Sequence, residues 1–158
     1  MRLFPLIFLT LAACAAPNPW KFNSIATDDP IFDSARLTYL AATPLQFELM
    51  RLGQQIEGFL NLTKHKFSSV PQGMIKAEFR IGEEKIEETL PLLEGNMRLR
   101  CSSQLTERLI VALQEGKEVI ILVDGFEERL NPAHFLRAYK KLQAKETFLK
   151  NLPLKGLL

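Results

Sequence analysis

The sequence contains only two histidines, the side chains most often used for acid–base chemistry and metal binding near neutral pH. His65 stands between Lys64 and Lys66, whose positive charges disfavour both protonation of the imidazole and binding of a metal ion. His134 is expected in the first turn of a helix. Zinc-protease, nucleophile-elbow, phosphate-loop, dinucleotide and CxxC motifs are absent. We therefore expect both histidines to be solvated or capping residues, and we predict no catalytic, metal or cofactor-binding residue.

A group of glutamates is the other feature that could bind a cation. Its members are Glu83, Glu84, Glu87, Glu88 and Glu94. Calcium loops use an alternating pattern of Asp and Asn with a glycine, which this segment lacks. Two of the glutamates fall in an expected turn and two on the strand beside it. We therefore expect a solvated turn and strand face.

The most specific chemical feature lies at the start of the sequence. Arg2 is followed by nine uncharged residues, then Ala12, Ala13 and Cys14. A basic start, a short apolar core and small residues are typical of a secretory signal peptide, and the apolar stretch is too short to span a bilayer. The tetrapeptide Leu11-Ala12-Ala13-Cys14 resembles the lipobox of bacterial lipoproteins. In that family the cysteine thiol is acylated and cleavage leaves this cysteine as the new N-terminus, which implies that Cys14 is the lipidation site. The alternative is an ordinary buried N-terminal segment with an incidental cysteine.

This resemblance divides the chain into three parts. Residues 1–13 are the predicted signal peptide, residues 14–33 a lipidated N-terminus and tether rich in proline and small polar residues, and residues 34–158 a single globular domain. Trp20 and Phe22, within the tether, either pack on the domain or lie at a membrane interface. No aspartate follows Cys14, which by resemblance to Gram-negative lipoproteins implies the outer membrane. Several acyl chains on one cysteine would anchor the domain stably.

Cys101 is expected to be buried. If Cys14 is acylated, the chain offers Cys101 no disulfide partner, because these are its only two cysteines. Apolar residues occupy every second position from 97 to 101, which places Cys101 on the apolar face of a strand. The alternative is an intermolecular disulfide or a reactive thiol. The overall charge, 20 basic against 18 acidic residues, gives no support for nucleic-acid binding.

The hydrophobic pattern predicts a sheet for most of the domain. Alternating or continuous apolar residues predict strands over 35–40, 45–52, 56–62, 74–81, 85–92, 97–101, 119–123 and 126–130. The first six are expected to form a meander with one solvated face. Pro91 suggests an edge strand or a bulge, and Asp124-Gly125 a hairpin turn. The continuous apolar run 119–123 is typical of a central strand buried on both faces.

Two helices are predicted among these strands. Leu105, Leu109 and Leu113 lie on one helical face, with Ser103 as the N-cap and Gly116 just past the C-terminus. A strand over 109–113 is the alternative. Asn131-Pro132 is expected to start the second helix. The apolar face of this helix is predicted to be Phe135, Leu136, Tyr139 and Leu142. The fold class is therefore α+β, an antiparallel sheet or sandwich with one internal helix and a C-terminal helix.

The C-terminal segment is strongly basic. Residues 131–158 contain six basic residues and one acidic residue, Glu146, with leucines between them. Such a stretch can lie on anionic lipid or bind an acidic partner. It can equally be a terminal helix docked on the sheet with its lysines facing solvent.

Together these features predict a membrane-anchored envelope lipoprotein that acts as a non-enzymatic binding or interaction module. Its expected partners are membrane lipid, through acylated Cys14, and an envelope or host protein that the sequence does not identify. A cell-envelope hydrolase with an unrecognised active site and a structural component of an envelope complex are the alternatives.

Overall fold

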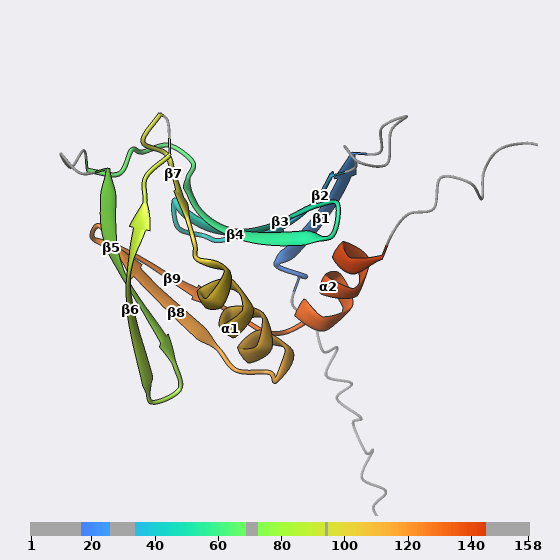
Figure 1. Cartoon of the computed structure of the whole chain (residues 1–158). Helices are drawn as coiled ribbons and strands as arrows, with labels where there is room; N and C mark the ends of the chain where they lie inside the picture. The colour runs from blue at the N-terminus through green and yellow to red at the C-terminus, as the bar shows by residue number, and fades with distance from the viewer. Residues whose placement is uncertain (1–16, 26–33, 69–72, 94, 145–158) are drawn as a thin grey trace, which may run out of the picture.

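The computed structural model describes residues 17–25, 34–68, 73–93 and 95–144. They form an α+β fold of two antiparallel sheets and two helices (Figure 1). The strands are β1 (Trp20–Ile25), β2 (Ser34–Tyr39), β3 (Leu45–Leu52), β4 (Gln55–Leu62), β5 (Met74–Ile81), β6 (Glu84–Pro91), β7 (Arg98–Arg100), β8 (Val119–Val123) and β9 (Phe126–Leu130). The helices are α1 (Ser103–Gln114) and α2 (Phe135–Gln143). No helix in these ranges is long and apolar enough to cross a membrane.

The first sheet has the strand order β1-β2-β3-β4-β7. Its centre is the predicted hairpin of β3 and β4, which turns at Gly53 in the left-handed conformation (φ 60°). Along each strand, alternate side chains point to the apolar face of the sheet. On this face Phe47, Leu60 and Leu99 are neighbours on three adjacent strands, and none of them has exposed surface. The opposite face carries mostly charged and polar side chains.

The second sheet has the strand order β6-β5-β8-β9. Pro91 ends β6 at the edge of this sheet, as predicted, and Asp124 and Gly125 both have positive φ in the tight turn between β8 and β9. β8 is a central strand, but Ile120 and Leu122 on its outer face are only half-buried. The prediction that this strand is buried on both faces is therefore wrong, because its apolar run packs on the core with alternate residues only.

The two sheets meet at a corner. After β4 the chain leaves the first sheet, forms the β5–β6 hairpin in the second, and returns as β7 beside β4. A bridge between Leu92 and Leu99 joins the end of β6 to β7. The predicted continuous meander is thus corrected to two sheets. The period of two specifies which face of a strand is buried but not which strand lies next to it.

α1 occupies the angle between the two sheets (Figure 1) and packs against β4 and β8. Its N-cap is Ser102, whose Oγ accepts a hydrogen bond from the Leu105 amide at 3.1 Å, so the predicted cap at Ser103 is wrong by one residue. Gly116 follows the helix with φ 76°, as predicted. The strand alternative for 109–113 is wrong, since a single face of this segment is buried with helical spacing.

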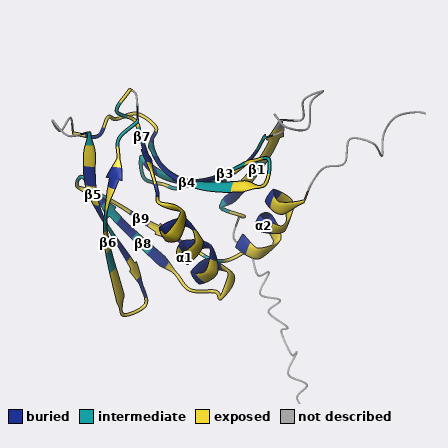
Figure 2. Ribbon diagram, in the orientation of Figure 1, coloured by how far each residue is buried: buried dark blue, intermediate teal, exposed yellow. Residues whose placement is uncertain are grey.

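α2 packs on β1 and β2, and it begins later than predicted. Asn131 does not cap the helix, because its Oδ1 accepts the Ala133 amide in a tight turn and the helix starts at Phe135. Leu136 is 46% exposed, so it does not belong to the apolar face. The buried positions are Phe135, Ala138, Tyr139 and Leu142. Buried residues of both sheets and both helices belong to one hydrophobic core. Figure 2 shows the buried positions in dark blue along these elements.

The predicted tether is wrong for Trp20–Ile25, which pair with β2 as an edge strand. Trp20 is 3% exposed and packs edge-on against Tyr39 and Phe135, with ring centroids 4.9 and 4.8 Å away. Its Nε1 donates a hydrogen bond to the Asn131 carbonyl at 3.0 Å. Of the two placements considered for Trp20, packing on the domain is therefore correct.

Candidate functional site

The predicted lipidation site, Cys14, lies outside the described residues and stays a prediction. Pro17 is the first residue of the described chain, three positions later. The segment that would carry the lipid therefore leads almost directly into β1.

Cys101 is buried and free, as predicted. It follows β7 immediately, and its amide donates a hydrogen bond to the Gly58 carbonyl at 2.9 Å, so the sheet pairing continues to this residue. Burial raises the pKa of its thiol to about 12. Because the thiolate is the reactive form, this cysteine is a poor nucleophile and a poor metal ligand.

The two histidines stand on separate elements. His65 is exposed in the loop after β4, where its ring lies 5.9 Å from that of Phe126. His134 is the exposed N-cap residue of α2 and makes no capping hydrogen bond through its side chain. Solvation, rather than capping, is therefore the correct interpretation.

Two of the three glutamates of β6, Glu84 and Glu87, are in ion pairs. Glu87 pairs with Lys76 and Lys85, and these two lysines lower the pKa of its carboxyl to about 2. Glu88 accepts the Ser102 amide at 3.3 Å. Glu94 lies outside the described residues, and within them no group of three histidine, cysteine or acidic side chains could hold a metal ion. The interpretation as a solvated face is confirmed for Glu87.

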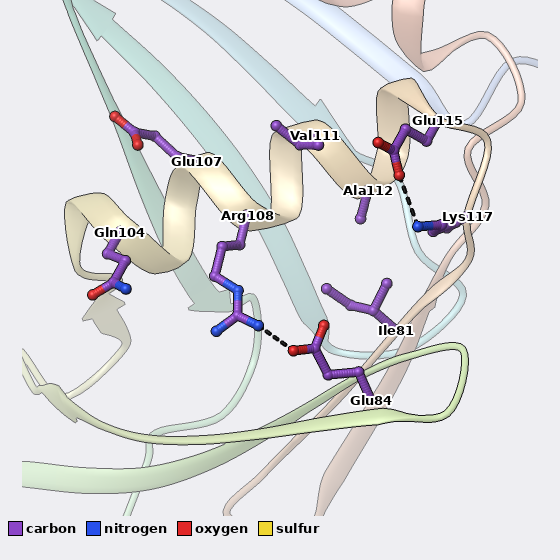
Figure 3. A pocket seen from close by; sticks show the side chains of 9 residues that line it. All are labelled: Ile81, Glu84, Gln104, Glu107, Arg108, Val111, Ala112, Glu115 and Lys117. Carbon is purple, nitrogen blue, oxygen red and sulfur yellow. Dashed lines mark hydrogen bonds and ion pairs between the residues drawn. The ribbon is translucent and has the colours of Figure 1, made fainter.

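A shallow groove separates α1 from the β5–β6 turn (Figure 3). Ile81, Val111 and Ala112 supply apolar surface to it. Most of its charges are already paired, since Glu84 binds Arg108 and Glu115 binds Lys117 at 2.7 Å, which leaves Glu107 without an ion pair among the described residues. A ligand would have to compete with these pairs, so the groove is a weak candidate site.

A second candidate is a charged cluster on the outer face of the first sheet, which we call the Glu48 cluster: Glu48, Arg36, Arg98 and Phe59. The Glu48 side chain is 5% exposed and lies 3.3 Å from Arg36 Nε and 2.6 Å from an Arg98 amino nitrogen. The Arg98 guanidinium lies 3.7 Å over the centre of the Phe59 ring, and burial lowers the pKa of Arg98. Its Nε is buried without a hydrogen-bond partner in the described chain.

A buried carboxylate faces the core on β9. Glu128 is 6% exposed and accepts hydrogen bonds from the Thr43 hydroxyl and from the Arg129 amide, the latter at 3.0 Å. Both partners are donors from the chain itself. The bond from Thr43 ties β9 to the segment before β3, so a structural role accounts for this glutamate.

A third candidate is the groove between β1 and α2, which we call the β1–α2 groove. Asn18, Trp20 and Phe22 line one side, and its volume is about 410 Å³. The other side is lined by Ala138 and by the cationic or polar residues His134, Arg137 and Lys141. No acidic residue lines it. Among the described residues, neither Arg137 nor Lys141 forms an ion pair.

Sequence reasoning identified Trp20, Phe22 and the basic C-terminal segment separately, but it missed that they share this groove. It missed the Glu48 cluster altogether, because the cluster draws one residue from each of four strands.

Comparisons with protein-family models, curated proteins and solved structures found no match for this chain. The β1–α2 groove has aromatic side chains beside unpaired positive charge. This combination is better suited to binding an anionic ligand than to catalysis.

Proposed function

We propose that this chain is a lipid-anchored protein of a bacterial cell envelope that acts as a non-enzymatic binding or interaction module. The observation that carries the proposal is the lipobox-like tetrapeptide Leu11-Ala12-Ala13-Cys14 after a short apolar segment. A domain follows within a few residues, so acylation of Cys14 would hold that domain at a membrane surface. The outer membrane is the proposed location, since alanine rather than aspartate follows the cysteine.

An interaction role is supported by how the described side chains are used. The thiol of Cys101 is buried with a raised pKa, and two of the glutamates considered as possible cation ligands are in ion pairs, Glu87 with lysine and Glu84 with arginine. A hydrolase would need a nucleophile and a base within hydrogen-bond reach of each other. The unpaired cations of the β1–α2 groove are instead suited to binding.

Replacing Cys14 with serine tests the anchor. In bacteria fed a labelled fatty acid, we expect the wild-type chain to carry label and to fractionate with membranes, whereas the Cys14→Ser chain carries none and is released. Cys101→Ser is the matched control, because it removes the other cysteine and leaves the lipobox intact. Separation of inner and outer membranes on a density gradient tests the location.

The proposal fails if the Cys14→Ser chain still carries lipid and remains in the membrane fraction. It also fails if labelling depends on Cys101 instead. Label on the wild type with accumulation in the inner membrane would correct the location alone.

A further inference from the structure

The positive charge of this chain is concentrated at one end. Residues 1–130 contain 14 basic and 17 acidic residues, whereas residues 131–158 contain six basic and one acidic residue. In the described chain this excess lies on α2, which carries Arg137, Lys140 and Lys141 and no acid. The exposed face of α2 is therefore positive on a domain that is otherwise slightly acidic.

These three cations are exposed, and none of them forms an ion pair with another described residue. The outer face of the second sheet differs, since there Lys76 and Lys85 both pair with Glu87. The charge of α2 is thus available to an external anion. Leu136, 46% exposed, lies next to Arg137 on the same outward side of the helix.

The start of the described chain lies beside these cations. Asn18, Arg137 and Lys141 line the same groove. Asn18 is four residues after Cys14, and four extended residues span at most about 14 Å. A lipid on Cys14 would therefore insert into a membrane close to the exposed face of α2, at a distance comparable with the ~10 Å range of electrostatic interactions in moderate salt.

We propose that the exposed face of α2 (Leu136, Arg137, Lys140 and Lys141) and the adjoining β1–α2 groove bind the headgroups of anionic phospholipids in the membrane that anchors Cys14. The inference rests on the proposed function for the position of the anchor. The cations supply charge complementarity to lipid phosphates, and Leu136 supplies apolar contact at the interface. A basic surface beside an acylated cysteine strengthens anchoring and fixes which side of the domain faces the membrane.

The test is vesicle binding by the full chain carrying Cys14→Ser, which cannot be acylated. Its sedimentation with phosphatidylcholine vesicles is compared with that in an equimolar mixture of phosphatidylcholine and phosphatidylglycerol. The apolar residues 3–11 are present in every variant, so the ratio between the two vesicle types isolates the headgroup charge. We expect the preference for anionic vesicles to weaken as salt rises.

Two double variants locate the surface. Arg137→Gln with Lys141→Gln removes two cations from the groove, and we expect roughly 5- to 25-fold weaker binding to anionic vesicles. Lys64→Gln with Lys66→Gln is the matched control. It removes two exposed cations from the loop after β4, at the far end of the molecule from α2 (Figure 1), and we expect less than twofold loss. All four side chains are exposed, so each variant is expected to fold.

Each outcome is informative. Equal binding of the parent chain to neutral and anionic vesicles would overturn the inference, and so would equal losses in both double variants, which would indicate net charge rather than this face. An acidic protein recovered on α2 without any headgroup preference would replace lipid as the occupant. These results are independent of the labelling of Cys14. The proposal that Cys14 is acylated and the proposal that α2 binds anionic headgroups can therefore each be refuted without the other.

Discussion

At the scale of single residues, the thiol of Cys101 is shielded from water because its neighbour, Gly58, has no side chain. Gly58 lies next to it in the sheet, and a Cβ built on Gly58 would stand 2.8 Å from Thr106 Oγ1 and 3.4 Å from the Cβ of Cys101. Glycine at this position lets α1 pack closely against β4. The close packing excludes water from Cys101, and the loss of water is what raises its pKa.

The raised pKa of Cys101 predicts a loss of stability at alkaline pH. Below the ordinary thiol pKa of 9.0, the group is protonated in both the folded and the unfolded chain. Above it, the unfolded thiol ionises while the folded thiol stays neutral up to about pH 12, so ionisation favours unfolding. We expect this group alone to lower the free energy of unfolding by up to about 1.4 kcal/mol per pH unit in that window.

Urea unfolding of the Cys14→Ser chain, one pH unit below and one above 9.0, measures this slope. Cys101→Ala in the same background is the control, since it removes the thiol and keeps every other titrating group. The alanine variant should have a lower free energy of unfolding at the lower pH, and it should lose less of that free energy as the pH rises. Identical slopes for the two chains would show that Cys101 is accessible to solvent.

At the scale of elements, local sequence signals predicted the hairpins and the helices. They did not predict the pairing of strands that are distant in the sequence. Gly53 and the Asp124-Gly125 turn specify their hairpins within a few residues, which is why these were predictable. The return of β7 to β4 was not, because the periodicity of a strand carries no information about its partner. β1 was missed for a related reason. The prolines on either side of it are typical of a linker, and only the packing of Trp20 against Tyr39 and Phe135 shows that the segment belongs to the sheet.

The Glu48 cluster illustrates the same limit at a candidate site. Arg36, Glu48 and Arg98 come from β2, β3 and β7, and each alone is an ordinary polar residue on a solvated face. Only the strand order brings them together. The positive charge of the C-terminal segment was visible in the composition, but its position beside Trp20 depends on α2 packing against β1.

Two glutamates on the same outer face provide a matched test of the cluster. Glu48→Gln leaves Arg98 half-buried with its best partner weakened, and we expect a loss of about 2–3 kcal/mol in the free energy of unfolding. This is less than for fully buried pairs, because Arg36 and Arg98 still reach water. Glu57 pairs with the more exposed Arg100, so Glu57→Gln should cost at most about 1 kcal/mol. Chemical denaturation measures both, and equal losses would contradict a buried role for Glu48.

At the scale of the whole molecule, one core serves both sheets. Leu99 is fully buried where they meet, paired with Leu60 in the first sheet and bridged to Leu92 at the end of β6. α1 lies in the angle between the sheets and contacts each of them. Neither sheet can therefore lose its apolar face without exposing that of the other, and we expect them to unfold together.

Leu99→Ala tests this shared core. Truncating a fully buried leucine should lower the free energy of unfolding by about 2–5 kcal/mol. Trp20, the only tryptophan, reports on the first sheet through its fluorescence, and hydrogen exchange of the β8 amides reports on the second. Both probes should shift by the same amount, because the cavity lies in a core common to both sheets. Val111→Ala, on the exposed side of α1, is the control and should change either reading by no more than about 0.5 kcal/mol. If the Trp20 transition moved while the slowest β8 amides kept their protection, the two sheets would be separate folding units joined only at a corner.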